Sequence, residues 1–216
     1  MRLLAFDCCG DVRSAALLAD EAVIGSDRAT GARRHAEALV PLIDELLAAA
    51  GWSYASLDLL AVGRGPGSFT GIRVAVAAGR ALALAVDRPV LGIDGRDVLL
   101  AAGEPSDART RVAAIDARRG GLYAAWATTR TVHALRAMTP DDVAAAVPGD
   151  LVVRGSGADL LAAAAGPRAV AAAGEIGAIG IAEQARAQIA AGAVPTAGHL
   201  LQPLYLRAAD AVPRAA

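Results

Sequence analysis

Residues 61–76 read AVGRGPGSFTGIRVAV, an apolar strand-like run that breaks into glycines and resumes with the pattern of a helix. A glycine-rich turn of this kind often binds a phosphate, because its backbone N–H groups and the start of the following helix attract an anion. The first chemical question that the sequence raises is therefore whether this loop binds a phosphate.

Two phosphate-binding motifs fail on their spacing. A P-loop needs a lysine directly after its second glycine, but Ile72 follows Gly71, and Gly65 and Gly71 are one residue too far apart. A dinucleotide fingerprint needs a third glycine that opens a helix, which residues 68–70 do not supply. The remaining interpretation is a tight turn between strand and helix, in which Ser68 or Thr70 caps the helix.

Acidic residues at the ends of two strands are the other candidates for chemistry. Asp7 ends the first strand and is followed by Cys8 and Cys9. Asp116 lies with Arg118 and Tyr123 in the segment AIDARRGGLY, with no histidine, lysine or hydroxyl nucleophile beside it in sequence. We therefore expect an ion pair between lobes and a core tyrosine from this segment rather than an acid–base set.

Composition excludes several reaction classes. All 21 basic residues are arginine, so a P-loop lysine, a Schiff-base lysine and a Ser–Lys dyad are impossible. The net charge of −1, the scattered arginines and the 3% aromatic content are unlike a stand-alone nucleic-acid binder. The two cysteines are adjacent and the three histidines far apart, so we expect no disulfide and no metal site. No secretory signal and no uninterrupted apolar run of membrane-spanning length is visible, so we expect a soluble cytoplasmic protein.

The elements that position these residues follow from hydrophobic periodicity. Strands are predicted at 2–8, 12–20, 21–29, 57–63 and 89–93, with helices at 33–50, which contains Pro41, and at 70–86. This β-β-β-α-β-α-β order matches the ribonuclease-H-like unit of the actin, Hsp70 and sugar-kinase superfold. It predicts an α/β first lobe, residues 1–104, with a mixed five-stranded sheet.

A smaller α/β second lobe is predicted over residues 105–216. It contains a strand–turn–strand unit at 111–129, a strand at 150–155, and a tail after about residue 208 that we expect to be disordered. Its predicted helices lie at 139–147, 156–165 and 175–191.

The two helices of the first lobe have more apolar surface than one sheet covers. They therefore resemble half of a four-helix bundle that awaits another pair, unless the second lobe covers them. The residues expected at this partner interface are Leu39, Leu42, Ile43, Leu46, Val74, Ala78 and Leu82.

Five ordered segments resemble the motifs of the TsaB (YeaZ) family. The string GRGPGSFTGIR matches the family signature, and LLAFDCCGDVRSAAL, RHAEALVPLIDELL, AAIDARRGGLYAA and PLYLR match other segments, so the likeness spans residues 1–207. The signature residues are Gly63, Arg64, Gly65, Pro66, Gly67, Ser68, Phe69, Thr70, Gly71 and Arg73.

This resemblance implies a two-lobed fold and a part in forming N6-threonylcarbamoyladenosine next to the anticodon of tRNAs that read codons beginning with A. It implies a non-catalytic scaffold without a cofactor, a heterodimer with a TsaD-type transferase, and a TsaE-type ATPase that joins the two. A homodimer is expected when the chain is alone, with tRNA bound only through the complex.

The resemblance also leaves a degenerate nucleotide site at Asp7, Cys8, Cys9 and Asp116, because the family commonly has Thr and Ser or Ala where the two cysteines stand. At the metal-binding histidines of the catalytic paralogue this chain has Gly95 and Leu99. Three alternatives stay open: a small-molecule kinase or ATPase that uses Asp7 and the glycine loop, a metallopeptidase, and a plain homodimeric interaction module.

Overall fold

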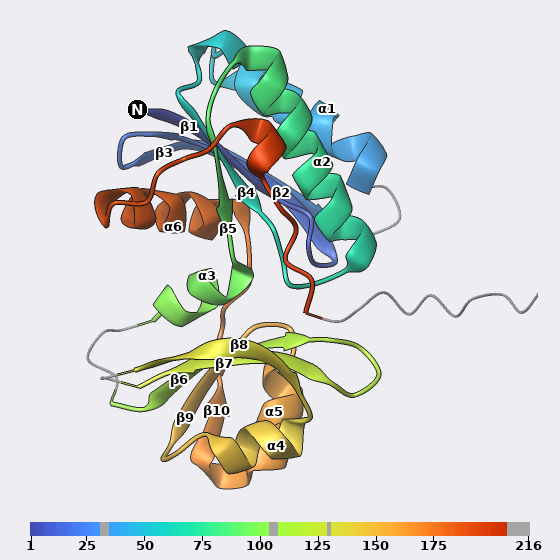
Figure 1. Ribbon diagram of the computed structural model, residues 1–216, viewed down its shortest axis with the longest axis vertical. Helices are drawn as coiled ribbons and strands as arrows, with labels where there is room; N and C mark the ends of the chain where they lie inside the picture. The colour runs from blue at the N-terminus through green and yellow to red at the C-terminus, as the bar shows by residue number, and fades with distance from the viewer. Residues whose placement is uncertain (31–34, 104–107, 129–130, 207–216) are drawn as a thin grey trace, which may run out of the picture.

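The computed structural model describes residues 1–30, 35–103, 108–128 and 131–206, which form two α/β halves (Figure 1). The first half is built on a five-stranded sheet in the order β3-β2-β1-β4-β5. Strands β1 (Arg2–Asp7), β2 (Val12–Ala19) and β3 (Ala22–Thr30) form an antiparallel meander. Strands β4 (Leu59–Gly63) and β5 (Val90–Ile93) run parallel to β1. The mixed five-stranded sheet expected from the sequence is therefore confirmed.

Helices cover both faces of this sheet. Helices α1 (His35–Ala49) and α2 (Phe69–Val86) pack on the face that presents Leu4, Phe6 and Leu60. Helix α6 (Ala178–Ala190) packs on the opposite face (Figure 1). Burial on both faces explains why β1 and β4 are almost continuously apolar rather than alternating.

The second half has its own five-stranded sheet, in the order β10-β9-β6-β7-β8. Helices α4 (Pro140–Ala146) and α5 (Ala158–Ala165) cover one face of it. Helix α3 (Gly95–Ala101) packs on the other face and lies between the two sheets (Figure 1). The strands are β6 (Thr110–Asp116), β7 (Leu122–Ala127), β8 (Val132–Met138), β9 (Leu151–Arg154) and β10 (Ala169–Ala171).

After the second half, the chain returns to the first. Helix α6 packs on the first sheet, and the segment from residue 191 to residue 206 runs back along α2, with a 3₁₀ turn at Gly198–Leu200 (Figure 1). The expectation that residues 105–216 form a lobe by themselves is therefore wrong for α6 and the segment that follows it. The apolar face of α6 has its complement on β1, β2 and β4, a long-range pairing that its own periodicity does not specify.

Three elements were not predicted from the sequence, namely α3, β8 and β10. Helix α3 has only seven residues, β10 has three, and β8 is mostly exposed and lacks a regular alternation of apolar and polar residues. The predicted boundary at residue 104 and the predicted tail after residue 208 lie outside the described residues.

Helix α2 is long and apolar enough, by length and composition, to cross a membrane, although Arg73 and Arg80 interrupt its apolar run. A third of that stretch is buried inside the protein, and the helix packs on the sheet through Ile72, Ala75 and Val76. The side chain of Arg80, in the middle of the helix, is fixed to the backbone of Leu201. One side of α2 is therefore packed on the protein's own sheet.

Candidate functional site

The glycine loop connects the end of β4 to the start of α2. The Oγ of Ser68 accepts a hydrogen bond from the backbone N–H of Gly71 over 3.3 Å and so caps α2. Gly65 has a φ of +111°, a region that glycine enters easily, and the Gly65–Pro66 peptide bond is cis. The loop is thus a strand-to-helix turn with its own cap.

One side of the loop lies directly on the turn between β1 and β2. The backbone N–H of Ser68 donates to the carbonyl oxygen of Cys9 over 2.7 Å. A methyl group at Gly67 would overlap the carbonyl of Cys9, and one at Gly71 would overlap that of Cys8. Glycine is therefore required at both positions because two backbone segments touch there.

Asp7 is enclosed by the same contact. Its side chain is almost fully buried, and Oδ2 accepts the backbone N–H of Cys9 over 3.1 Å. Oδ1 faces Gly63 and has no hydrogen-bond partner. Burial raises the pKa of Asp7 to about 6, against which the hydrogen bonds from Cys9 act only in part.

The two cysteines beside Asp7 are inert thiols. Burial raises the pKa of Cys8 to about 12, and burial with the nearby carboxyl of Asp7 raises the pKa of Cys9 well above its usual value. A thiol reacts as its thiolate, so neither side chain is activated as a nucleophile. The Sγ of Cys9 instead faces the carbonyl of Gly63 at 3.5 Å.

The residues at this place do not fit the phosphates and Mg²⁺ of a nucleotide. A carboxylate that helps to hold Mg²⁺ must be ionised and reachable from solvent, whereas Asp7 is enclosed and its ionisation is disfavoured. The N–H of Ser68, which would otherwise face an anion, is bonded to Cys9. A reaction step that uses a nucleotide bound at Asp7 is therefore not supported.

The second half contributes the other acid, Asp116, at the end of β6. Its carboxylate accepts the backbone N–H of Arg118 over 2.7 Å, and its own N–H donates to Ser156 Oγ over 3.0 Å. The guanidinium of Arg118 reaches across to Asp11 in the β1–β2 turn, at 3.1 Å. The expected ion pair between the lobes exists, with Asp11 as the partner, and Tyr123 packs in the cluster around α3.

The other side of the loop is fixed by an ion pair that sequence reasoning missed. The Nε of Arg64 lies 2.6 Å from Oδ1 of Asp94, which is only 8% exposed. The carbonyl of Gly65 accepts the N–H of Gly95, and that of Arg64 accepts the N–H of Leu204, both over 2.8 Å. A single aspartate between a strand and a helix gives no specific signal in the sequence. The signature loop thus joins β1, α2, α3 and the returning C-terminal segment.

No metal centre is assembled at the positions of Gly95 and Leu99, which carry no ligand atoms in their side chains. Gly95 lies against Ile176, and Leu99 is buried in the core beside α3. Within the described ranges, no three His, Cys, Asp or Glu side chains come together in a way that would hold a metal ion.

The residues expected at a partner interface fall into two groups. Leu39, Leu42, Ile43 and Leu46 are buried against the chain's own sheet. Val74, Ala78 and Leu82 are half-buried and pack against the same core. Other small or apolar residues are exposed on the two helices, together with the acids Glu37, Asp44 and Glu45 of α1. We call five of the small or apolar residues the helix-pair face: Val40, Pro41, Ala48, Ala77 and Ala81.

The remaining signature residues lie at the exposed start of α2. The ring of Phe69 is half-exposed and contacts Tyr205 with 5.4 Å between ring centroids. The guanidinium of Arg73 lies over the ring of Phe69 at 5.2 Å. Thr70 is exposed and does not cap the helix.

Comparisons with known proteins agree with this architecture. The family model described as TsaD, tRNA N6-adenosine threonylcarbamoyltransferase, matches residues 29–147, which is more than half of the chain. YeaZ from Pseudomonas aeruginosa superimposes with a TM-score of 0.79 and 29% identity, covering 95% of this chain and 99% of that one. A ROK hexokinase from Thermus thermophilus shares the fold at a TM-score of 0.50 and 15% identity, covering 88% of this chain and 100% of that one.

Curated sequences give the same relationship. The tRNA threonylcarbamoyladenosine biosynthesis protein TsaB of Escherichia coli is 35% identical over 128 residues, which cover 59% of this chain and 54% of that protein. The protein of the same name from Haemophilus influenzae is 45% identical over 92 residues, or 42% of this chain and 39% of that one. The chain therefore spans about half the length of the curated relatives, or less, in these matches.

The two five-stranded sheets with α3 between them define an α/β protein with the actin-like fold that the ROK hexokinase shares. Within this class, the chain belongs to the TsaB (YeaZ) family.

Proposed function

We propose that this protein takes part in the formation of N6-threonylcarbamoyladenosine on tRNA as the non-catalytic partner of a TsaD-type threonylcarbamoyltransferase. The names of its relatives supply the pathway, and the enclosure of Asp7 supplies the argument against catalysis by this chain. The single observation that carries the proposal is that the signature loop is bonded to the Cys8–Cys9 segment rather than open to a ligand.

The helix-pair face is the surface that we assign to the transferase. Three of its five residues are alanines, and small side chains let helix backbones approach closely. Two further helices packed on it would complete a four-helix bundle. In the same proposal the protein acts in the cytoplasm, pairs with itself when the transferase is absent, admits a TsaE-type ATPase to the complex, and meets tRNA only through that complex.

Light scattering after size-exclusion chromatography tests the assignment, with the chain alone and mixed with the TsaD-type protein from the same source. We expect a one-to-one complex that Val40→Asp disrupts, because Val40 is 41% exposed on α1 and the variant can fold. Val132→Asp, an equally apolar and more exposed position on β8 in the other half, is the matched control and should leave the complex intact.

Two results would contradict the proposal. One is the absence of any complex at high concentration. The other is sustained ATP hydrolysis by the purified chain that Asp7→Asn abolishes, which would make the protein an enzyme of the sugar-kinase type.

A further inference from the structure

A groove of about 900 Å³ runs along α2 on the side where the C-terminal segment returns. Helix α2 forms one wall and residues 195–205 form the other. In Figure 1 the C-terminal helical turn, drawn in red, lies on one side of α2 and α1 lies on the other, so the groove shares only Ala77 and Ala81 with the helix-pair face. The residues that line it include Arg73, Ala77, Arg80, Leu84, His199 and Tyr205.

The walls of the groove are fixed to each other. The Nε of Arg80 donates to the carbonyl of Leu201 over 2.8 Å. Val90 and Thr196 exchange two backbone hydrogen bonds of 2.8 and 2.9 Å. Gly198 touches α2 so closely that a methyl group there would lie 2.8 Å from the Cβ of Ala83. A partner would therefore meet a preformed surface and lose little binding energy to ordering it.

The charge of the groove is positive and uncompensated. Arg73, Arg80 and Arg88 line it, and Asp87 is the single acid among its described lining residues. Arg80 and Arg88 bond to backbone carbonyls, and Arg73 covers the ring of Phe69, so their charges meet no carboxylate among the described residues. Most other arginines whose contacts are known, such as Arg64 and Arg186, are paired with acids.

The surface between these charges is apolar. Leu84 is 83% exposed, and Ala77, Ala81 and Tyr205 continue the apolar lining. Together these side chains form an apolar strip in the groove, and it is a contiguous strip rather than a single exposed leucine that indicates a surface covered by another protein.

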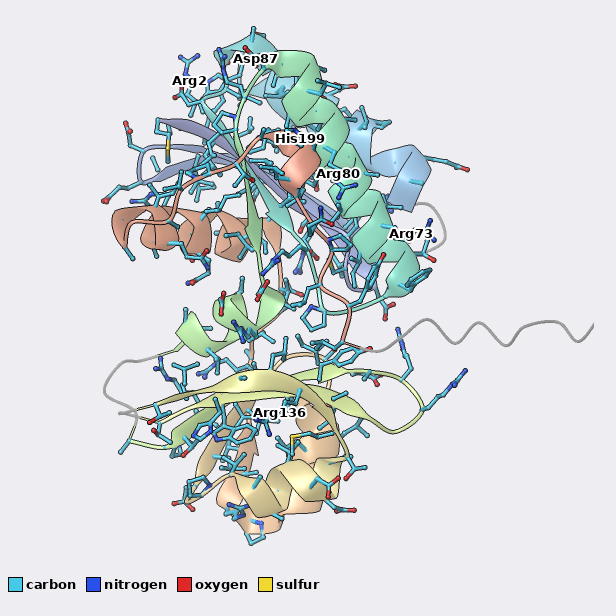
Figure 2. The ribbon with its side chains drawn as sticks, in the orientation of Figure 1. Arg2, Arg73, Arg80, Asp87, Arg136 and His199 are labelled. Carbon is cyan, nitrogen blue, oxygen red and sulfur yellow. The ribbon has the colours of Figure 1, made fainter. Side chains whose placement is uncertain are left out.

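The charged positions on α2 repeat at a spacing of seven residues. Arg73 and Arg80 therefore lie along one side of the helix, and Asp87 follows α2 as its left-handed C-cap; Figure 2 shows the three in that order with His199 beside Arg80. Seven residues of helix span about 10 Å. A second helix laid along α2 would therefore meet two positive charges about two turns apart.

We propose that this groove binds an amphipathic helix of a partner protein that carries two carboxylates seven residues apart on an apolar face. The carboxylates pair with Arg73 and Arg80, where Arg73 is free to form a bidentate contact, and the apolar face covers Leu84 and Ala77. RNA fits this lining less well, because the walls are aliphatic and proline-rich, and the aromatic rings of Phe69 and Tyr205 already face each other.

Fluorescence anisotropy with labelled synthetic peptides tests the proposal on the full chain, without the transferase. The probe is an amphipathic helix of about 18 residues with glutamates seven apart on a leucine and alanine face. The control peptide has glutamine at both positions, and a labelled oligouridylate represents RNA. The protein variants are Arg73→Glu and Leu84→Ser, both at exposed positions, with Arg136→Glu on β8 as the matched charge control (Figure 2).

We expect saturable binding of the acidic peptide that weakens at least about tenfold with the glutamine peptide, with Arg73→Glu and with added salt. Leu84→Ser should weaken it severalfold, and Arg136→Glu should leave it unchanged. The proposal is overturned if the acidic peptide does not bind, if Arg73→Glu has no effect, or if oligouridylate binds more tightly in the same groove. Complex formation with the transferase is measured in a separate experiment. If the acidic peptide does not bind, the proposed function is not affected, and if no complex with the transferase forms, the peptide result is not affected.

Discussion

The backbone N–H of Ser68 donates to the carbonyl oxygen of Cys9, and this bond seats the signature loop on the turn between β1 and β2. The loop has the composition of a phosphate-binding turn, yet its anion-facing donor is used inside the protein. The glycines of the motif are explained by close backbone contacts with Cys8 and Cys9, and by the positive φ of Gly65. In this chain the motif is a structural junction.

Gly67→Ala tests that junction. The added methyl group would overlap the carbonyl of Cys9, and neither backbone segment can move independently, so we expect a loss of about 1–3 kcal/mol in the free energy of unfolding. Urea denaturation followed by circular dichroism measures it. Gly10→Ala, where the nearest heavy atom lies 4.0 Å from the added methyl group, is the control and should change stability little. Equal stability of both variants would mean that the loop does not rest on Cys9.

Asp7 should make stability depend on pH in a direction opposite to that of a paired surface acid. Burial raises its pKa from 3.8 to about 6 in the folded protein, so the folded state prefers the protonated carboxyl. The stabilisation is full below pH 3.8 and is lost as the pH rises through about 6. We expect the difference in unfolding free energy between wild type and Asp7→Asn to fall by about 2 kcal/mol from pH 4 to pH 7.5.

The measurement is a series of urea titrations at several pH values for both proteins. Because all other titrating groups are shared, they cancel in the difference. A difference that stays constant with pH would show that Asp7 is ionised in the folded protein, which would reopen the question of a cation or phosphate at this place.

Asp94 holds the opposite side of the loop. It is buried and lies 2.6 Å from Arg64 and 3.5 Å from Arg96, so Asp94→Ala leaves the partly exposed guanidinium of Arg64 without its carboxylate, whereas Arg96 keeps its pair with Asp97. We expect a loss of about 1–3 kcal/mol in the free energy of unfolding, less than for a fully buried pair. Asp20→Asn removes the exposed negative charge from its pair with the N-terminus, and asparagine still tolerates the positive φ of residue 20, so this variant should have little effect. A similar result for both variants would place Asp94 among the surface ion pairs.

The sequence predicts the features of this fold that depend on contacts between residues close in the chain, and it does not predict those that depend on residues far apart. Local signals sufficed for α2, expected at 70–86 and found at Phe69–Val86, because Ser68 caps its start and apolar residues continue to Val86. They also sufficed for α1, which tolerates Pro41 within its span. Long-range pairing was not visible, since nothing in the periodicity of α6 specifies β1 and β4 as its partners.

The candidate site likewise combines local features that the sequence predicts with long-range contacts that it does not predict. A cap by Ser68 or Thr70 follows from residue types alone, and the doubt about a nucleotide at Asp7 follows from the family resemblance. The pairing of Arg64 with Asp94, and of Arg118 with Asp11, depends on segments 30 and 107 residues apart in the chain. Burial of Leu39 and Leu46 against the sheet could not be distinguished from exposure to a partner, because both outcomes require the same apolar stripe.

The pair of Arg118 and Asp11 joins the two halves at 3.1 Å, but both side chains are about 70% exposed. Water screens such a pair, and holding two long side chains in place costs entropy, so we expect a coupling energy below about 1 kcal/mol. A double-mutant cycle with Asp11→Ala and Arg118→Ala, measured by urea denaturation at low and high salt, gives that energy. The halves are then held mainly by the apolar cluster around α3, in which Leu99 is buried against Ile115. A coupling energy of several kcal/mol that resists salt would instead make this ion pair the main contact between the halves.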